Sequence, residues 1–215
     1  MKHLVIFGAP GSGKGTQSKK LEEKYGIRVV STGDLLRAEV AAGSEIGKTC
    51  ADIMAQGKFP DNAIVFKLIE LFLDKNSDAE GILYDGFPRT VEQAEYLLNL
   101  LTQRKEMIQT VINIGVDEDV LIKRISGRFA CATCGEIYNK YFKTPSTEGV
   151  CDVCGSDTFK VRSDDNEDTV KTRMMMYEEA TAPVLDFFRD RDLNIILVDG
   201  MQPVDVVFHQ IENIL

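Results

Sequence analysis

Gly8-Ala-Pro-Gly-Ser-Gly-Lys-Gly-Thr16 is the stretch that decides the fold of this chain of 215 residues. Gly8, Gly13 and Lys14 match the phosphate-loop pattern G-x-x-x-x-G-K, in which backbone N–H groups surround phosphate oxygens and the lysine adds a mobile charge. The spacing alone is weak evidence. It gains weight because the loop follows the apolar run His3–Phe7 and precedes a helical pattern. A glycine-rich turn without a ligand is the lesser alternative.

Short apolar runs alternate with helical patterns outward from this loop, which predicts an α/β fold with a five-stranded parallel sheet flanked by helices. The predicted strands are His3–Phe7, Arg28–Val30, Gly81–Tyr84, Thr110–Ile114 and Asn194–Val198. The predicted helices are Lys14–Tyr25, Leu35–Ala42, Ile64–Asp74, Val91–Gln103, Val120–Ile125 and Val204–Ile214. A longer helix begins between Asp164 and Asp168, and we expect Pro183 to bend or interrupt it. Residues 31–75 form a helical excursion without a strand.

The charge balance excludes a chain that binds nucleic acid along its whole length. Acidic residues number 34 against 25 lysines and arginines, which leaves a net charge of −9. Because phosphate contacts supply most of such binding, any phosphate must instead meet a local basic cluster. No apolar run approaches the roughly 20 residues that span a bilayer, and the start lacks a signal-peptide core. We therefore expect a cytoplasmic protein with no membrane and no nucleic-acid partner.

Residues 129–162 interrupt the alternation and are rich in cysteine, glycine and threonine. Two C-x-x-C pairs, separated by sixteen residues, have the spacing of a tetrahedral zinc site. Four thiolates leave no open position for water, so the predicted metal is structural. Two disulfides and an iron site are the alternatives. The candidate ligands are Cys131, Cys134, Cys151 and Cys154, whereas Cys50 is interpreted as an ordinary helix residue.

Two further motifs carry candidate ligand residues. Ser31-Thr-Gly-Asp-Leu-Leu-Arg37 has a simpler interpretation, because its serine, threonine or aspartate can cap a helix. Asp85-Gly-Phe-Pro-Arg89 follows the predicted strand Gly81–Tyr84 directly, and ligands of open α/β sheets gather at the carboxyl ends of strands. Gln93 lies one helical turn beyond the arginine. Charged and polar residues at this place favour a ligand-binding site over a position in the apolar core.

Several arginines could form the local basic cluster that the acidic composition requires. Each of them alone is best interpreted as a solvated charge. Together with Lys14, Arg37 and Arg89 they could hold phosphate groups. The remaining members of the set are Arg124, Arg128, Arg162 and Arg173.

At this point the residues resemble the adenylate kinase family of nucleoside monophosphate kinases, over the whole chain. The matching segments are GAPGSGKGT at 8–16, STGDLLR at 31–37, DGFPR at 85–89 with Gln93, GR at 127–128, Arg162, Arg173 and VDG at 198–200. Gly15, in place of the usual Ser or Thr after the lysine, is normal for this family. The resemblance implies a core at 1–30, 61–128 and 163–215, an AMP-binding helical insert at 31–60, and a long zinc-binding lid at 129–162.

The resemblance also implies which residues hold the nucleotides. The implied ATP ligands are Gly11, Ser12, Gly13, Lys14, Gly15, Thr16, Arg128, Ile137, Tyr138 and the backbone of Gln202. The implied AMP ligands are Thr32, Arg37, Lys58, Phe59, Pro60, Gly86, Phe87, Pro88, Arg89, Gln93, Arg162 and Arg173. The implied catalytic set is Lys14, Arg89, Arg124, Arg128, Arg162 and Arg173, with Asp85 orienting magnesium. Phe129 and Asn139 depart from the family pattern, which often has arginine and histidine there.

The implied activity is reversible transfer of the terminal phosphoryl group of ATP to AMP, giving two ADP, with Mg²⁺ as cofactor and Zn²⁺ as a structural ion. The acceptor phosphate is ionised at neutral pH, so no general base is needed. We expect a monomer. The alternatives are a GTP:AMP phosphotransferase, a non-catalytic nucleotide sensor, and a phosphate-loop ATPase that carries a nucleic-acid-binding zinc ribbon.

Overall fold

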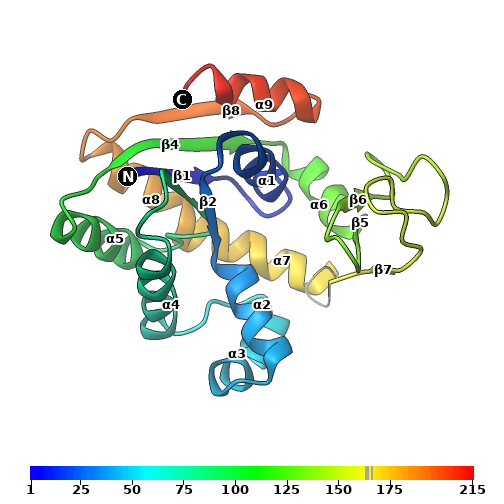
Figure 1. Cartoon of the computed structure of the whole chain (residues 1–215), viewed down its shortest axis with the longest axis horizontal. Coiled ribbons are helices and arrows are strands. Elements are labelled where there is room, and N and C mark those ends of the chain that lie inside the picture. The colour runs from blue at the N-terminus through cyan, green and yellow to red at the C-terminus, as the bar shows by residue number, and fades with distance from the viewer. Residues whose placement is uncertain (163–164, 166) are drawn as a thin grey trace.

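The computed structural model describes residues 1–162, 165 and 167–215 and is built around one parallel sheet (Figure 1). Its strands are β1 (Lys2–Phe7), β2 (Arg28–Ser31), β3 (Gly81–Asp85), β4 (Ile108–Gly115) and β8 (Ile195–Asp199), in the order β2-β3-β1-β4-β8. All four pairings are parallel. The predicted five-stranded parallel sheet is confirmed, and the ends of the strands differ from the predicted ends by two residues at most.

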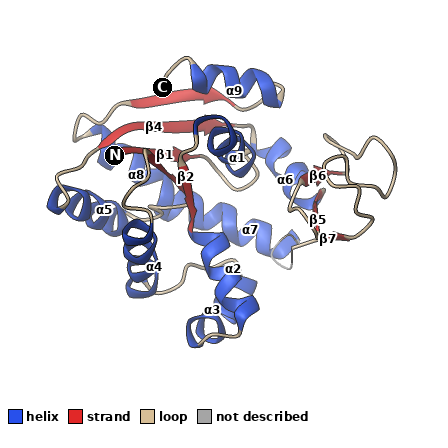
Figure 2. Ribbon diagram, viewed as in Figure 1, coloured by secondary structure: helices blue, strands red, loops and turns tan. Residues whose placement is uncertain are grey.

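Helices cover both faces of this sheet, because successive residues of β1 point to opposite sides (Figure 2). Leu4 and Ile6 pack in one cluster with residues of α1 (Lys14–Tyr25) and α9 (Val204–Glu212). Val5 and Phe7 pack in another with α4 (Asn62–Lys75), α5 (Val91–Gln103) and α8 (Ala182–Arg189). Two apolar layers explain the continuous apolar runs of the strands. Each fully buried aliphatic side chain in them contributes roughly 1.5–3 kcal/mol.

The predicted helical excursion consists of α2 (Thr32–Ala42), α3 (Glu45–Ala55) and α4 in succession. Side chains of Ser31, Ser44 and Asp61 accept a hydrogen bond from the first turn of these three helices in order. Gly47 lets α3 approach α2 closely, since a Cβ there would lie 2.1 Å from the carbonyl oxygen of Glu39. Cys50 is fully buried in α3, as expected of an ordinary helix residue.

The predicted long helix is interrupted near its proline. It consists of α7 (Glu167–Met176), a π-helical turn η1 (Tyr177–Thr181) and α8, in which Pro183 is the second residue. Proline has no N–H group and its ring clashes with the preceding turn, so a wider turn directly before it relieves both problems. The helix begins within the predicted window, of which 164 and 166 lie outside the described residues.

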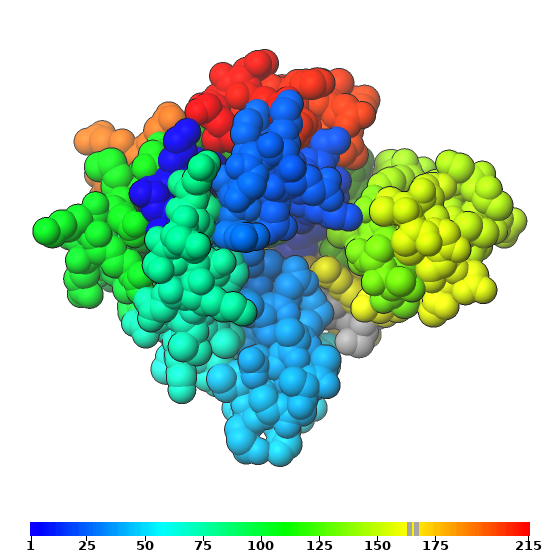
Figure 3. All heavy atoms as spheres, viewed as in Figure 1, coloured from blue at the N-terminus to red at the C-terminus, as the bar shows by residue number. Residues whose placement is uncertain are grey.

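Residues 129–162, called the lid below, form a separate lobe at the right of Figure 3. With the preceding Arg128 they contain a second, antiparallel sheet of β5 (Arg128–Cys131), β6 (Ile137–Asn139) and β7 (Phe159–Lys160), in the order β6-β5-β7. The lid follows α6 (Glu118–Ser126) and precedes α7. A small aromatic cluster of Phe129, Tyr138 and Phe159 fills it, with ring centroids 5.4–5.7 Å apart. The lid therefore has an apolar core that the sequence pattern did not reveal.

Candidate active site

The loop between β1 and α1 requires glycine at several positions. Gly8, Gly11 and Gly13 have φ angles of 146°, 82° and 99°, which side chains rarely tolerate. A Cβ at Gly8 would also lie 2.4 Å from Ser12 Oγ. Because Gly13 caps α1 without a side chain, the positive end of that helix faces the loop. The loop thus has the backbone geometry of an anion site.

Two polar side chains of this loop indicate that a ligand is expected there. Within the described residues, the hydroxyl of Ser12 is buried and has no hydrogen-bond partner. Lys14 Nζ donates to the carbonyl oxygens of Gly8 at 2.6 Å and Ala9 at 3.0 Å, so the ammonium folds back over the loop. Phosphate oxygens would satisfy both groups.

Positive charge converges on Lys14. Burial lowers the pKa of Lys14 to about 8; Asp85 opposes this, whereas Arg89, Arg173 and Arg128 lower it further. These five residues come from five different elements or loops, yet they are close enough to influence one charge. The acidic chain therefore has the local basic cluster that its composition demanded.

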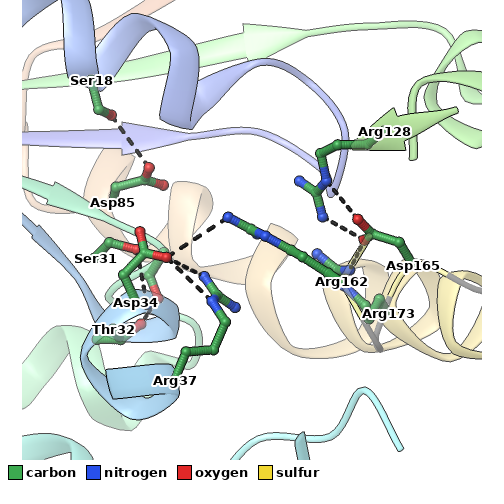
Figure 4. Close-up of polar contacts among 11 residues, drawn as sticks. Ser18, Ser31, Thr32, Asp34, Arg37, Asp85, Arg128, Arg162, Asp165 and Arg173 are labelled. Carbon is green, nitrogen blue, oxygen red and sulfur yellow. Dashed lines mark hydrogen bonds and ion pairs between the residues drawn. The ribbon is translucent and has the colours of Figure 1, made fainter. Parts of the chain in front are cut away.

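Asp85 ends β3 and lies beneath the start of α1. Ser18 donates to its Oδ2 at 3.4 Å (Figure 4). Burial raises the pKa of Asp85, and Lys14 opposes that shift. A Cβ at Gly15 would lie 3.6 Å from the same oxygen, so glycine keeps open the space in front of this carboxylate. A carboxylate next to a phosphate loop is chemically suited to Mg²⁺.

The segment after β3 is held from two sides. Thr32 Oγ1 donates to the carbonyl oxygen of Gly86 at 2.8 Å, and Arg89 Nε donates to the same oxygen at 2.7 Å. Gln93 Oε1 accepts the backbone N–H of Arg89 at 2.8 Å. The guanidinium of Arg89 also lies over the ring of Phe59, 5.2 Å from its centroid. The STGD and DGFPR motifs and the 58–60 loop therefore meet at one place.

Two carboxylates, Asp165 and Asp34, bind four of the predicted arginines (Figure 4). Asp165, whose side chain is fully buried, accepts from Arg128 Nε at 2.7 Å and from Arg173 Nη1 at 3.2 Å. Asp34 accepts from Arg37 Nε at 3.2 Å and lies 3.7 Å from Arg162 Nη2. The structure thus places these arginines in two adjacent groups.

The charge environment of Asp34 also indicates a strongly basic site. Burial alone would raise the pKa of Asp34, but Arg37 and Arg162 hold it below its usual value. Two arginines surround each of Asp34 and Asp165, so positive charge exceeds negative charge at both places. Phosphate groups bound there would neutralise that excess.

Arg124 lies at the base of the lid. Its Nη2 donates to the carbonyl oxygen of Gly200 at 2.9 Å, and its guanidinium lies 5.6 Å from the ring centroid of Phe142. Asn139 Nδ2 donates to the backbone oxygen of Arg124 at 2.7 Å, and its Oδ1 accepts the N–H of Tyr141 at 2.9 Å. Asn139, which differs from the family pattern, thus links the lid to α6 through these two hydrogen bonds.

The four lid cysteines form a compact cluster. Their Sγ atoms all lie within 4.8 Å of one another, and the Cys131–Cys154 and Cys134–Cys151 pairs are each separated by 3.6 Å. Four ligands about 2.3 Å from zinc would be roughly 3.8 Å apart, whereas a disulfide needs about 2.05 Å. All four cysteines are free thiols, so the structure does not contain the disulfides that the sequence left open.

Tyr138 connects this cluster to the aromatic core of the lid. Its hydroxyl donates to Cys151 Sγ at 3.5 Å and accepts the N–H of Asp152 at 2.8 Å. That hydrogen bond lowers the pKa of Cys151 to about 6, which favours a thiolate ligand. Tyr138 as a whole is 1% exposed, so its ring and hydroxyl are enclosed within the lid.

Comparison with known proteins agrees with this geometry. The family model for adenylate kinase matches residues 6–193. The adenylate kinase of Sphingopyxis alaskensis is 46% identical over 213 residues, which is 99% of this chain and 97% of that protein. The chain belongs to the adenylate kinase family. The adenylate kinase of Zymomonas mobilis is 44% identical over 99% of this chain and 95% of its own length, and that of Nitrosococcus oceani is 43% identical over 98% and 97%.

Family membership confirms the resemblance that the motifs carried, and with it the phosphate-loop fold. In the described part of this adenylate kinase family member, no helix has the length and apolarity to cross a bilayer. Sequence reasoning missed Asp165, which it placed only within the window where a long helix begins. Its position between Arg162 and Arg173 is the only signal that could have singled it out.

Two predicted base contacts are already occupied within the protein. Gln93 is 2% exposed, and besides accepting from Arg89 it donates from Nε2 to Asn62 Oδ1 at 2.8 Å. Thr32 is 3% exposed and donates to Gly86. Gln202, by contrast, is exposed, and its side chain bonds Asp199 at 2.9 Å. Whether these residues contact a base stays a prediction.

Proposed function

We propose that this chain transfers the terminal phosphoryl group of ATP to AMP and so interconverts ATP plus AMP with two ADP. The observation that supports this most strongly is the cluster of arginines around two carboxylates, with Arg128 and Arg173 on Asp165 and with Arg37 and Arg162 on Asp34. Two nucleotides that carry four or more negative charges between them require such a cluster. Membership of the adenylate kinase family supplies the substrate class.

The donor is proposed to lie along the phosphate loop. Backbone N–H groups of residues 11–16 and the Lys14 ammonium would hold its phosphates, and Arg128 would reach them from the base of the lid. The backbone at 137–138 and Gln202 would contact the adenosine. The orphaned Ser12 hydroxyl supports a phosphate at this loop.

The acceptor is proposed to lie between the 31–60 segment and the end of β3. Arg37, Arg89, Arg162 and Arg173 would hold its phosphate, in place of part of their present carboxylate contacts. The segment 58–60 and residues 86–88, with Thr32 and Gln93, would surround the nucleoside. The contacts among Thr32, Gly86, Arg89 and Phe59 support this assignment, because they bring all of these segments together.

The chemistry demands alignment and charge neutralisation. The attacking AMP phosphate oxygen is ionised at neutral pH, so no proton has to be removed by a base. Holding the two phosphates in line removes much of the entropic barrier. Lys14 and the arginines would then stabilise negative charge that spreads over the transferred group. Arg124 would support this from the base of the lid.

When bound with the donor, Mg²⁺ would supply positive charge that neutralises the phosphate groups. Asp85 is the residue proposed to orient it, since its carboxylate ends β3 next to the loop. The rest of this chain's contribution is to exclude water, because an open site would hydrolyse ATP. The proposed division is a core of 1–30, 61–128 and 163–215, an AMP-binding insert of 31–60, and a lid of 129–162 that closes over the phosphates.

The lid cysteines are proposed to hold a structural Zn²⁺. The four Sγ atoms have the mutual spacing of a tetrahedral tetrathiolate site. When bound, the ion would cross-link the two C-x-x-C turns of a module whose apolar core is only three rings. Its place in the lid keeps it out of the phosphoryl transfer.

A coupled assay of ADP formation tests the proposed function. The purified protein with Mg²⁺ is given ATP or GTP as donor and AMP, CMP or UMP as acceptor. We expect high activity with ATP and AMP and much lower activity with CMP and UMP. A preference for GTP would instead identify a GTP:AMP phosphotransferase. ATP hydrolysis without transfer to any monophosphate would refute the proposal.

A further inference from the structure

One carboxylate of the lid is shared by two lysines, and one of them does not belong to the lid. Glu136 lies between the first C-x-x-C turn and β6, and its side chain is 16% exposed. Its Oε1 contacts Lys143 Nζ at 2.5 Å, within the lid. Its Oε2 contacts Lys19 Nζ at 2.7 Å, from α1. The carboxylate is therefore positioned by both parts of the molecule.

The contact with Lys19 lies at the end of the β5–β6 hairpin that is farther from α6. At the other end, the backbone N–H of Lys140 donates to the oxygen of Gly127 at 2.9 Å. The pairing of Arg128 with Asn139 places that end of the hairpin beside α6. Glu136 precedes β6 at the opposite end. The hairpin is therefore attached to the rest of the molecule at both ends, by the backbone near Gly127 and by the ion pair with Lys19.

Lys19 belongs to the same helix that begins at Lys14. It is five residues, or about one and a half turns, beyond the phosphate-loop lysine. It also lies 3.9 Å from Glu23 on its own helix. Within the described part of the chain, no other ion pair joins α1 to the lid. The lid and the donor side of the phosphate site are thus connected by one charged contact.

We propose that the Lys19–Glu136 ion pair positions the lid over the donor site and so strengthens ATP binding. The proposal rests on the proposed function, because it assigns ATP to the phosphate loop. Glu136 directly precedes the backbone at 137–138 that is proposed to contact the adenosine. Holding Glu136 against α1 therefore keeps that backbone close to the loop. Lys19 and Glu136 are positioning residues and do not touch the reacting phosphates.

The size of the effect follows from the exposure of the pair. Lys19 has a 41% exposed side chain, so the contact is screened by solvent and salt. Exposed pairs of this kind change equilibria by about 1.5- to 5-fold. Removing Lys19 does not leave an isolated carboxylate, because Lys143 still contacts Glu136. The expected change therefore concerns the position of the lid and leaves its folding intact.

The test compares Lys19→Gln, Glu136→Gln and the double variant in the full-length, zinc-loaded enzyme. At about 0.05 M salt, each single variant should raise the KM for ATP by about two- to fivefold. The KM for AMP and kcat at saturating ATP should stay within experimental error. The double variant should have the same KM for ATP as each single variant, because either substitution alone already removes the Lys19–Glu136 contact. In about 1 M salt the differences should disappear.

Two control variants isolate the contact between α1 and the lid. Lys143→Gln removes the partner of Glu136 inside the lid, and Glu23→Gln removes the partner of Lys19 on its own helix. Neither should raise the KM for ATP as Lys19→Gln does. Zinc content and melting temperature of each variant exclude loss of the lid structure.

Three results would overturn the proposal: an unchanged KM for ATP at low salt, additive effects in the double variant, or an equal effect of Lys143→Gln. These outcomes are separable from failure of the proposed function. Failure of the proposed function means that the wild-type protein forms no ADP from ATP and AMP. An active wild-type enzyme whose variants behave like it would refute only the role of the Lys19–Glu136 ion pair.

Discussion

Replacing Lys14 by methionine should stabilise the nucleotide-free protein while it abolishes most of the activity. Burial lowers the pKa of Lys14 to about 8 from its ordinary value of 10.5. That difference corresponds to roughly 3 kcal/mol by which the charged lysine disfavours folding at pH 7. Solvent still reaches part of Lys14, and the variant loses hydrogen bonds to Gly8 and Ala9. We therefore expect a net gain of roughly 1–2 kcal/mol.

The pH dependence of this gain gives a second, independent check. The folded pKa of Lys14 is lowered, so its cost to stability is fully present below about pH 8. As the pH rises from 8 towards 10.5, the folded protein releases the proton before the unfolded chain does, and the cost decreases. The stability difference between Lys14→Met and wild type should therefore be smaller at pH 9.5 than at pH 7, by roughly 2 kcal/mol at most.

Thermal and chemical unfolding without nucleotide measure the effect. For a chain of this length, 1–2 kcal/mol corresponds to an increase of about 2–8 °C in melting temperature at pH 7. Lys67→Met, an exposed position on α4, is the matched control and should change the melting temperature little. In the coupled assay, kcat of Lys14→Met should fall by roughly a hundredfold or more. A variant less stable than wild type, or a gain that is independent of pH, would refute the reasoning.

Three further predictions concern the acceptor side and the metal. Arg89→Ala should lower kcat by roughly a hundredfold or more, because the guanidinium is proposed to stabilise the transferred phosphoryl group; near-normal kcat would contradict its assignment. Thr32→Ala should lower kcat/KM for AMP by about tenfold and reduce the preference for AMP over UMP, since a buried hydroxyl is lost from the proposed nucleoside pocket; steady-state kcat/KM values for AMP and UMP measure this, and an unchanged ratio of the two values would exclude the role. Cys151→Ser should release zinc and lower the melting temperature, while much of kcat remains at temperatures where the variant is folded; a folded, equally stable and inactive variant would mean that the metal takes part in the chemistry.

The sequence alone predicted those features that depend on neighbours in the chain. The five strands follow from continuous apolar runs, and α1 and α5 were predicted with the bounds that the structure has. The phosphate loop could be recognised because its glycines and lysine act through local backbone geometry. The interruption of the long helix near Pro183 follows from the missing N–H of that one residue. The cysteine spacing likewise indicated a four-ligand site before the thiols were seen together.

Only the tertiary structure decided which distant side chains meet. Asp165 looked like one acid among several at a helix start, yet it is the buried partner of Arg128, 37 residues earlier. Glu136 and Lys19 are 117 residues apart, and nothing in either local pattern indicates their contact. Phe129 stacks on Tyr138 because β5 and β6 pair in one register. Periodicity and motif spacing report short-range constraints, whereas these contacts depend on strand order and on packing between layers, which a single sequence does not encode in any local pattern.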